Sequence, residues 1–132
     1  MTTATDMAIA KTVDHSFDEA ITKVTERLKE QGFGILTEID VKKTLKTKID
    51  VDFRRYTILG ACNPPFAHKA LQAELNVGLM MPCNVIVYET DDGKVQVSGF
   101  NPEAMLSAFD RADLTDIAAE IRSRMATAIE GL

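Results

Sequence analysis

Three side chains that could bind a metal ion or act as a nucleophile or base lie close together in the sequence. These are Cys62, His68 and Cys83, in a chain with two cysteines and two histidines. The thiolate is the form of cysteine that attacks electrophiles and binds metals. Two cysteines and one histidine supply fewer donors than the four of a closed zinc site. We therefore expect no closed metal site and no resident cofactor, unless water or a second subunit completes the coordination.

Cys62 directly precedes the expected start of a helix. Asn63 is a residue type preferred at helix N-caps, and Pro64 suits the first helical position. A thiolate aimed at this helix start would be stabilised by the helix dipole, which lowers the thiol pKa and raises its reactivity. An inert Cys62 in a turn shaped by Gly60 and Asn63 is an equally coherent interpretation, because free cysteines are often buried. Pro64 and Pro65 also remove two N–H donors, which weakens any anion site at this helix start.

His68 falls on the polar side of the same expected helix, so we expect it to face solvent or a partner chain. It could act as a base toward Cys62 only if the corner before the helix folds tightly. No acidic residue nearby in the sequence could orient it, so a Cys–His hydrolase is not expected. The common phosphate-binding, dinucleotide-binding and hydrolase motifs are absent from the sequence, and no catalytic residue is identified.

Cys83 and Asn84 begin the most apolar segment of the chain, directly after a Met80-Met81-Pro82 sequence. Sulfur ligands at this point would favour Cu(I) over harder ions. Methionines here are also typical of simple core or interface packing, which is the more ordinary interpretation. The candidate ligand-binding residues are Cys62, Asn63, His68, Cys83 and Asn84.

The distance between the two thiols depends on the topology. If residue 83 starts a strand parallel to the one that ends near residue 62, the sulfurs are separated by about a strand length, roughly 17–20 Å. If residues 74–82 run back across the sheet, both thiols lie at one edge. A disulfide would then enclose a loop of ~20 residues and contribute about 3 kcal/mol in the chain-entropy description.

The elements that must position these residues have clear signals in the sequence. Ser16 and Glu19 form a capping-box pattern at the start of a helix that we expect to end at Gly32. Asp92-Gly93 suits a tight hairpin turn. Residues 41–48 fit either a short polar helix or an extended charged loop. Strand patterns occur at residues 7–13, 33–41, 53–61, 83–89 and 95–100, and helix patterns at residues 17–31, 63–74, 101–109 and 113–130.

Three finer expectations concern how the strands face. Phe33, Ile35 and Ile39 are placed on one side of the second strand. Arg54 and Arg55 should lie on opposite faces of the third, with one of them pairing with a carboxylate. The run of apolar residues 85–87 suggests that both faces of the fourth strand are covered. The elements together predict an α+β two-layer sandwich, in which helices pack on a sheet of about five strands that is mostly antiparallel or mixed.

Size and composition set the broad class. At 132 residues, with 45% hydrophobic and 27% charged residues, the chain fits one globular domain over residues 1–132. A net charge of −5 and the lack of a basic stripe with aromatics argue against nucleic-acid binding. No segment has the length and hydropathy of a membrane span, and the N-terminal residues do not resemble a secretion signal. We therefore expect a cytoplasmic protein with reduced thiols.

Two motifs carry a family resemblance. Residues 60–71 read GACNPPFAHKAL and residues 78–85 read GLMMPCNV. With the SFDEAI and GFGILTEIDV segments, they resemble the domain of unknown function 302 family over nearly the whole chain. The resemblance implies a small two-layer domain that forms homodimers, and it implies no activity.

The resulting functional hypothesis is a homodimeric domain that binds a small ligand or a soft metal ion near Asn63 and the MMPCN segment. One alternative is a thiol-based redox or sulfur-handling enzyme that uses Cys62, with Cys83 as its resolving partner. The other alternative is a structural or interaction domain whose cysteines are inert.

Overall fold

One antiparallel sheet of five strands organises the structure. The computed structural model describes residues 7–106, 109 and 111–132. The strands follow the order β1-β5-β4-β3-β2, and every neighbouring pair is antiparallel. Their bounds are β1 Ala8–Val13, β2 Gly34–Asp40, β3 Tyr56–Cys62, β4 Cys83–Glu89 and β5 Val95–Phe100.

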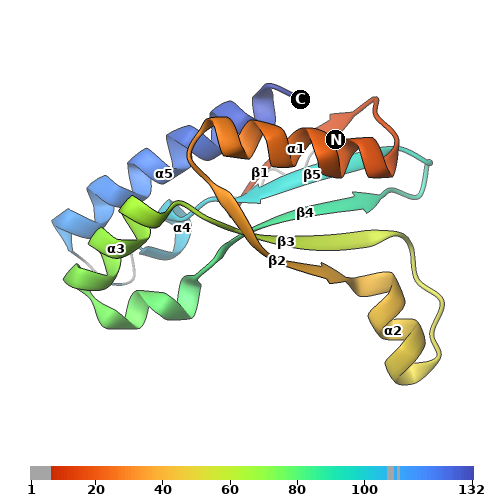
Figure 1. The fold of residues 1–132 in the computed structure, drawn as a ribbon, viewed down its shortest axis with the longest axis horizontal. Helices are drawn as coiled ribbons and strands as arrows, with labels where there is room; N and C mark the ends of the chain where they lie inside the picture. Colours follow the sequence, from red (N-terminus) through yellow and green to blue (C-terminus); the bar gives the residue numbers. More distant parts are fainter. Residues whose placement is uncertain (1–6, 107–108, 110) are drawn as a thin grey trace.

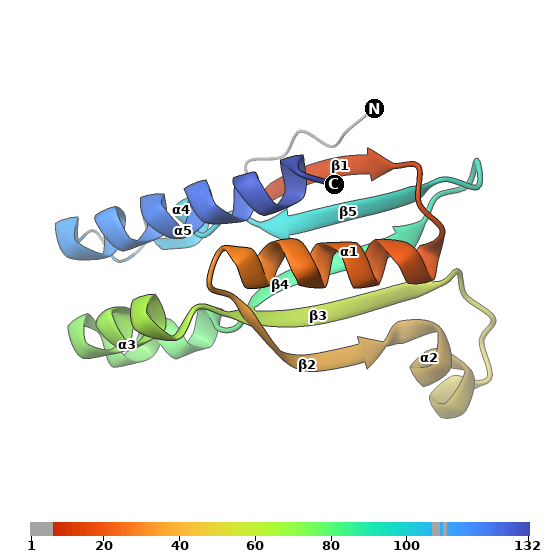
Figure 2. The same ribbon diagram turned by 45° about the horizontal axis from the view of Figure 1, so that its top comes forward.

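The helices make a second layer on one face of this sheet, which confirms the predicted two-layer α+β fold. Figure 2 shows α1 lying over the sheet and running roughly along its strands, with α5 beside it. Both helices contact the sheet and each other. The helices are α1 Phe17–Glu30, α2 Val41–Ile49, α3 Pro64–Ala73, α4 Glu103–Leu106 and α5 Ala112–Glu130, and a 3₁₀ helix, η1 Leu75–Met80, follows α3.

Local signals in the sequence explain the ends of α1. The Ser16 side chain accepts from the Glu19 N–H, and the Glu19 carboxylate accepts from the Ser16 N–H, so the predicted capping box is present. After the helix, Gly32 takes a positive φ of 89°, a conformation that glycine adopts without a steric penalty. This turn brings the chain directly into β2.

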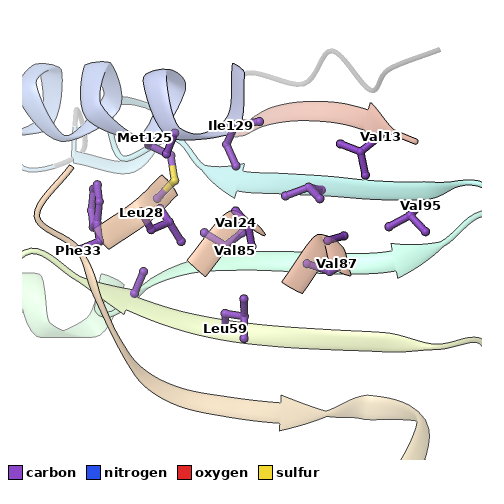
Figure 3. Packing of buried hydrophobic residues seen from close by; sticks show 14 of the residues in the cluster. Val13, Val24, Leu28, Phe33, Leu59, Val85, Val87, Val95, Met125 and Ile129 are labelled. Atoms are coloured by element: carbon purple, nitrogen blue, oxygen red, sulfur yellow. The ribbon is translucent and has the colours of Figure 1, made fainter. Parts of the chain in front are cut away.

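The core lies between α1, α5 and the central strands. Figure 3 shows Val85 and Val87 of β4 beside Val24 and Leu28 of α1, in one buried cluster. Each of these four side chains has 0% relative exposure. Burying a side chain of this size contributes roughly 1.5–3 kcal/mol, so this face of the sheet provides most of the driving force for folding.

Neither α1 nor α5 covers the opposite face of the sheet, which we call the open face (Figure 1). The prediction that both faces of β4 are covered is therefore wrong within one chain, because only the side that carries Val85 and Val87 meets the helices. The strand pairings place these residues on the open face: Ala8, Ala10, Thr12, Thr37, Ile39, Tyr56, Ile58, Gly60, Cys62, Asn84, Ile86, Tyr88, Gln96, Ser98 and Phe100.

A β-bulge changes the expected pattern of β2. The register with β3 shifts between Ile35 and Thr37. Ile35 packs against the core, whereas Ile39 lies opposite Ile58 on the open face. The expectation that both isoleucines share one side is therefore wrong, because the extra residue of a bulge reverses the alternation that follows it.

The segment between β2 and β3 is the helix α2, which resolves the two alternatives left open for residues 41–48. None of its residues is buried. Figure 1 shows it standing beyond the end of β2, away from α1 and α5. After it, Arg55 pairs with Asp18 at 2.7 Å and Arg54 with Asp91 at 2.6 Å, so both arginines find carboxylates.

Two predicted segments extend outside the described residues. The helix expected over residues 101–109 is seen as α4, while residues 107, 108 and 110 lie outside the description. Residues 1–6, on which the expectation about secretion signals partly depends, also lie outside it. Within the described part of the chain, no helix has the length and hydropathy to cross a membrane.

Candidate functional site

The two cysteines lie at the same end of neighbouring strands. β3 and β4 are antiparallel, and Ala61 lies directly opposite Cys83. Helix α3 and η1 carry the chain away from the sheet and back to the same edge. Both cysteines therefore lie at one edge, as in the second alternative, but the chain reaches it by a different route, because α3 packs against α5 and η1 beyond the strand ends instead of retracing β3 (Figure 2).

By strand register the two cysteines nevertheless belong to opposite faces of the sheet, although both line one cavity at its end. Ala61 is fully buried under the helices, so the alternation along β3 directs Cys62 to the open face. Cys83 is on the helix-covered face, where it packs against the core. Both cysteines are free, and each is partly exposed.

Two small apolar cavities adjoin Cys83 on the helix side. The first has a volume of about 40 Å³, and three sulfur-containing residues, Met80, Met81 and Cys83, are among those that line it. The second has a volume of about 30 Å³ and shares Met81 and Cys83 with the first, with Cys62 also in its lining. Both are far below the ~300 Å³ or more of a typical site for a drug-sized molecule. Their size and lining suit a single soft atom or a very small apolar molecule.

Burial controls the chemistry of Cys83. Desolvation, and to a lesser extent the nearby Cys62 thiol, raise the Cys83 pKa to about 11. Because the thiolate is the nucleophile, Cys83 is almost entirely unreactive near neutral pH.

Asn63 stabilises the site in a different way from the one expected. It occupies the N-cap position of α3, but its side chain makes no capping hydrogen bond. Its Nδ2 instead donates to the Gln31 carbonyl oxygen at 3.1 Å, and the residue is only 6% exposed. Asn63 therefore fixes the start of α3 to the turn after α1.

The other candidate residues lie outside the cavities. His68 is exposed on α3, as expected from the polar side of that helix. Asn84 is exposed on the open face and lines a separate hollow of about 210 Å³ beside Pro82 and Phe100. The structure thus groups Cys62, Asn63 and Cys83 around the second cavity and places His68 and Asn84 elsewhere.

Ile121 lines both cavities but was not among the sequence candidates. It comes from α5, far along the chain from the cysteine motifs. Ile117 and Ile121 have the helical spacing typical of a buried stripe. Spacing alone does not say which part of the sheet a helix covers. Within the described residues, no group of three or more His, Cys, Asp or Glu side chains is placed to hold a metal ion.

Comparisons with known proteins agree with this fold. The family model described as "Domain of unknown function DUF302" matches residues 9–132. An uncharacterized protein of Aquifex aeolicus is 31% identical over 105 residues, which cover 70% of this chain and 72% of that protein. The crystal structure of an uncharacterized conserved DUF302 protein from Bacillus stearothermophilus is 30% identical. It has a TM-score of 0.87 and covers 94% of this chain and 96% of its own.

Proposed function

We propose, starting from the fact that the chain belongs to the DUF302 family, that it is a binding domain for a soft metal ion rather than an enzyme. The site is the cavity of about 40 Å³ lined by Met80, Met81 and Cys83. The observation that carries the proposal is the meeting of three sulfur-bearing side chains in a space that suits one ion.

Cu(I) fits this set of donors best. Thioether and thiolate ligands select soft d¹⁰ ions, whereas Mg²⁺ and Ca²⁺ require oxygen donors. One Cys83 thiolate would neutralise the single charge of Cu(I), and a neutral complex is tolerated in an apolar cavity far better than an isolated charge. Met80 and Met81 would complete the coordination without adding charge.

Binding must displace the proton of Cys83, because metal ligands bind in their deprotonated form. Because the pKa of the Cys83 thiol is about 11, this thiol holds its proton tightly at neutral pH. The ion therefore has to compete with a proton, and its apparent affinity rises with pH up to that pKa. Zinc, which requires four strong donors in a structural site, gains much less here.

The test is an anaerobic titration with Cu(I) against a chromogenic chelator, repeated with Ag(I) as a probe that does not change oxidation state. We expect one ion per chain and a rise in Tm on binding. Cys83→Ser should weaken binding about 100-fold or more, and Met81→Leu about tenfold.

Cys62→Ser is the matched control, because Cys62 does not line the cavity of about 40 Å³. It should leave the affinity within about threefold of the wild type. No binding of Cu(I) or Ag(I), or equal binding by Cys83→Ser, would overturn the proposal. The chain would then be an interaction domain with inert thiols.

A further inference from the structure

We propose that Cys62 is the entry residue for the soft metal ion: it takes the ion from an incoming complex and passes it to Cys83. This inference rests on the proposed function and adds the route by which that site fills and empties. Cys62 lines only the cavity of about 30 Å³, whereas Met81 and Cys83 line both cavities. The cavities therefore lie side by side, with the same two sulfur-containing residues between them.

The apolar lining of both cavities requires such a route. An isolated charge in apolar surroundings is strongly unfavourable, so a bare ion does not cross this region. The ion has to move by ligand exchange, in which a new bond to sulfur forms before the old one breaks. Met81 borders both cavities and can hold the ion during the exchange without adding charge. Cys62 is also near enough to Cys83 to influence the pKa of that thiol.

Cys83 alone is poorly suited to receive the ion from outside. The thiolate is the form that binds metals, and a pKa of about 11 leaves only about one Cys83 thiol in ten thousand ionised at pH 7. Cys62 ends β3 and is partly exposed, so an incoming complex can reach it. Its neighbour Asn63 donates to the Gln31 carbonyl oxygen at 3.1 Å, which fixes this corner of the chain beside the cavity.

The transfer consists of two exchanges in which Cu(I) keeps its oxidation state. In the first, a bond forms between Cu(I) and the Cys62 sulfur while the bond to the donor's ligand breaks, and the Cys62 proton leaves to that ligand or to the buffer. In the second, Cu(I) bonds to the Cys83 sulfur and leaves Cys62, and the Cys83 proton passes to the Cys62 sulfur. Cys62 thus accepts the proton that binding must displace from Cys83.

Rates of metal transfer, measured anaerobically by stopped flow, test the proposal. Apo-protein is mixed with the Cu(I) complex of a chromogenic chelator to measure loading, and Cu(I)-loaded protein is mixed with excess free chelator to measure release. We expect Cys62→Ser to slow loading and release by about tenfold or more each. Because the entry residue acts in both directions, the ratio of the two rates, and hence Kd, should stay within about threefold of the wild type.

The double variant Cys62→Ser/His68→Cys is the matched control. It restores a second thiol at an exposed position of α3 that lines neither cavity, so transfer should stay slow. Circular dichroism checks that both variants fold. Wild-type rates in Cys62→Ser, or wild-type rates restored by the double variant, would overturn the entry role while leaving the binding site intact. Absence of Cu(I) binding by the wild type would instead overturn the proposed function, and the entry role with it.

Discussion

Cys83 shows how the position of one side chain determines its chemistry. On β4 it points under the helices, where desolvation raises its pKa to about 11. Cys62 follows Ala61, the residue of β3 opposite Cys83, and so has the register of the other face, although both cysteines line one cavity. A thiol-based enzyme would need its resolving thiol to ionise, which the raised pKa of Cys83 disfavours at neutral pH. This arrangement favours Cys83 as a ligand that ionises only when it binds a cation.

The raised pKa of Cys83 predicts how the stability of the protein depends on pH. Below about pH 9 the thiol is protonated in both the folded and unfolded states. Between the ordinary value of 9.0 and about 11, the unfolded chain loses this proton while the folded chain keeps it. The free energy of unfolding therefore falls with rising pH across this window, by roughly 3 kcal/mol in total.

Urea denaturation from pH 8 to pH 11, at fixed protein concentration and in the presence of a reductant, measures this effect. Cys83→Ala removes the titrating group, so the difference in unfolding free energy between wild type and variant should shrink as the pH rises. Other groups titrate in both proteins and cancel in the difference. Two curves that stay parallel over the whole range would contradict the assignment.

At the scale of the elements, the sequence predicted helices and strands well where local chemistry decides them. The Ser16–Glu19 capping box, Gly32 after α1 and Asp92-Gly93 in the hairpin all act through neighbouring residues. The β2 bulge was not predictable in this way, because a register shift depends on the partner strand. The closeness of Cys62 and Cys83 likewise depends on the antiparallel pairing of β3 and β4, which no local signal determines.

Gly60 of β3 lies close to Thr37 of β2 and to Pro82, just before β4, so a substitution there tests how these three strands pack. A Cβ built at this position would lie 2.1 Å from the Thr37 Oγ1 and 2.8 Å from the Pro82 ring. We expect Gly60→Ala to lower the free energy of unfolding by about 1–3 kcal/mol, because the bulged strand and the entry to β4 must move apart.

Gly34→Ala is the matched control for this substitution. Gly34 lies in β2, and a Cβ there would meet no atom within 4 Å. Its effect on the midpoint of urea denaturation should stay within the ~0.5 kcal/mol that is typical of surface changes. Equal stability of the two variants would show that the contacts of Gly60 relax without a penalty.

At the scale of the whole molecule, α2 and the open face share one property, because neither is covered by the rest of the described chain. A nine-residue helix is marginal in water by itself, and α2 buries none of its residues within the chain. The unbroken Val85-Ile86-Val87 run predicted that both sides of β4 are covered, while one chain covers only one. The homodimer that the family resemblance implies would cover both features, and this stays a prediction.

Hydrogen exchange measured at two protein concentrations tests this explanation. If α2 is held by a partner, protection of its backbone amides should rise about tenfold or more between ~1 µM and ~200 µM protein, because exchange follows local opening. The amides of α1, which packs within its own chain, serve as the internal control. Concentration-independent protection of α2 would show that contacts within one chain are enough to hold it.

The strand order also has a consequence for how the protein is made. β2, β3, β4 and β5 pair in the order in which they are synthesised, so each strand can join the one before it as the chain emerges. β1 is made first but pairs with β5, which is made last. On the ribosome, the first strand must therefore wait without a partner until nearly the whole chain has been translated. The sheet closes from its final strand back to its earliest one.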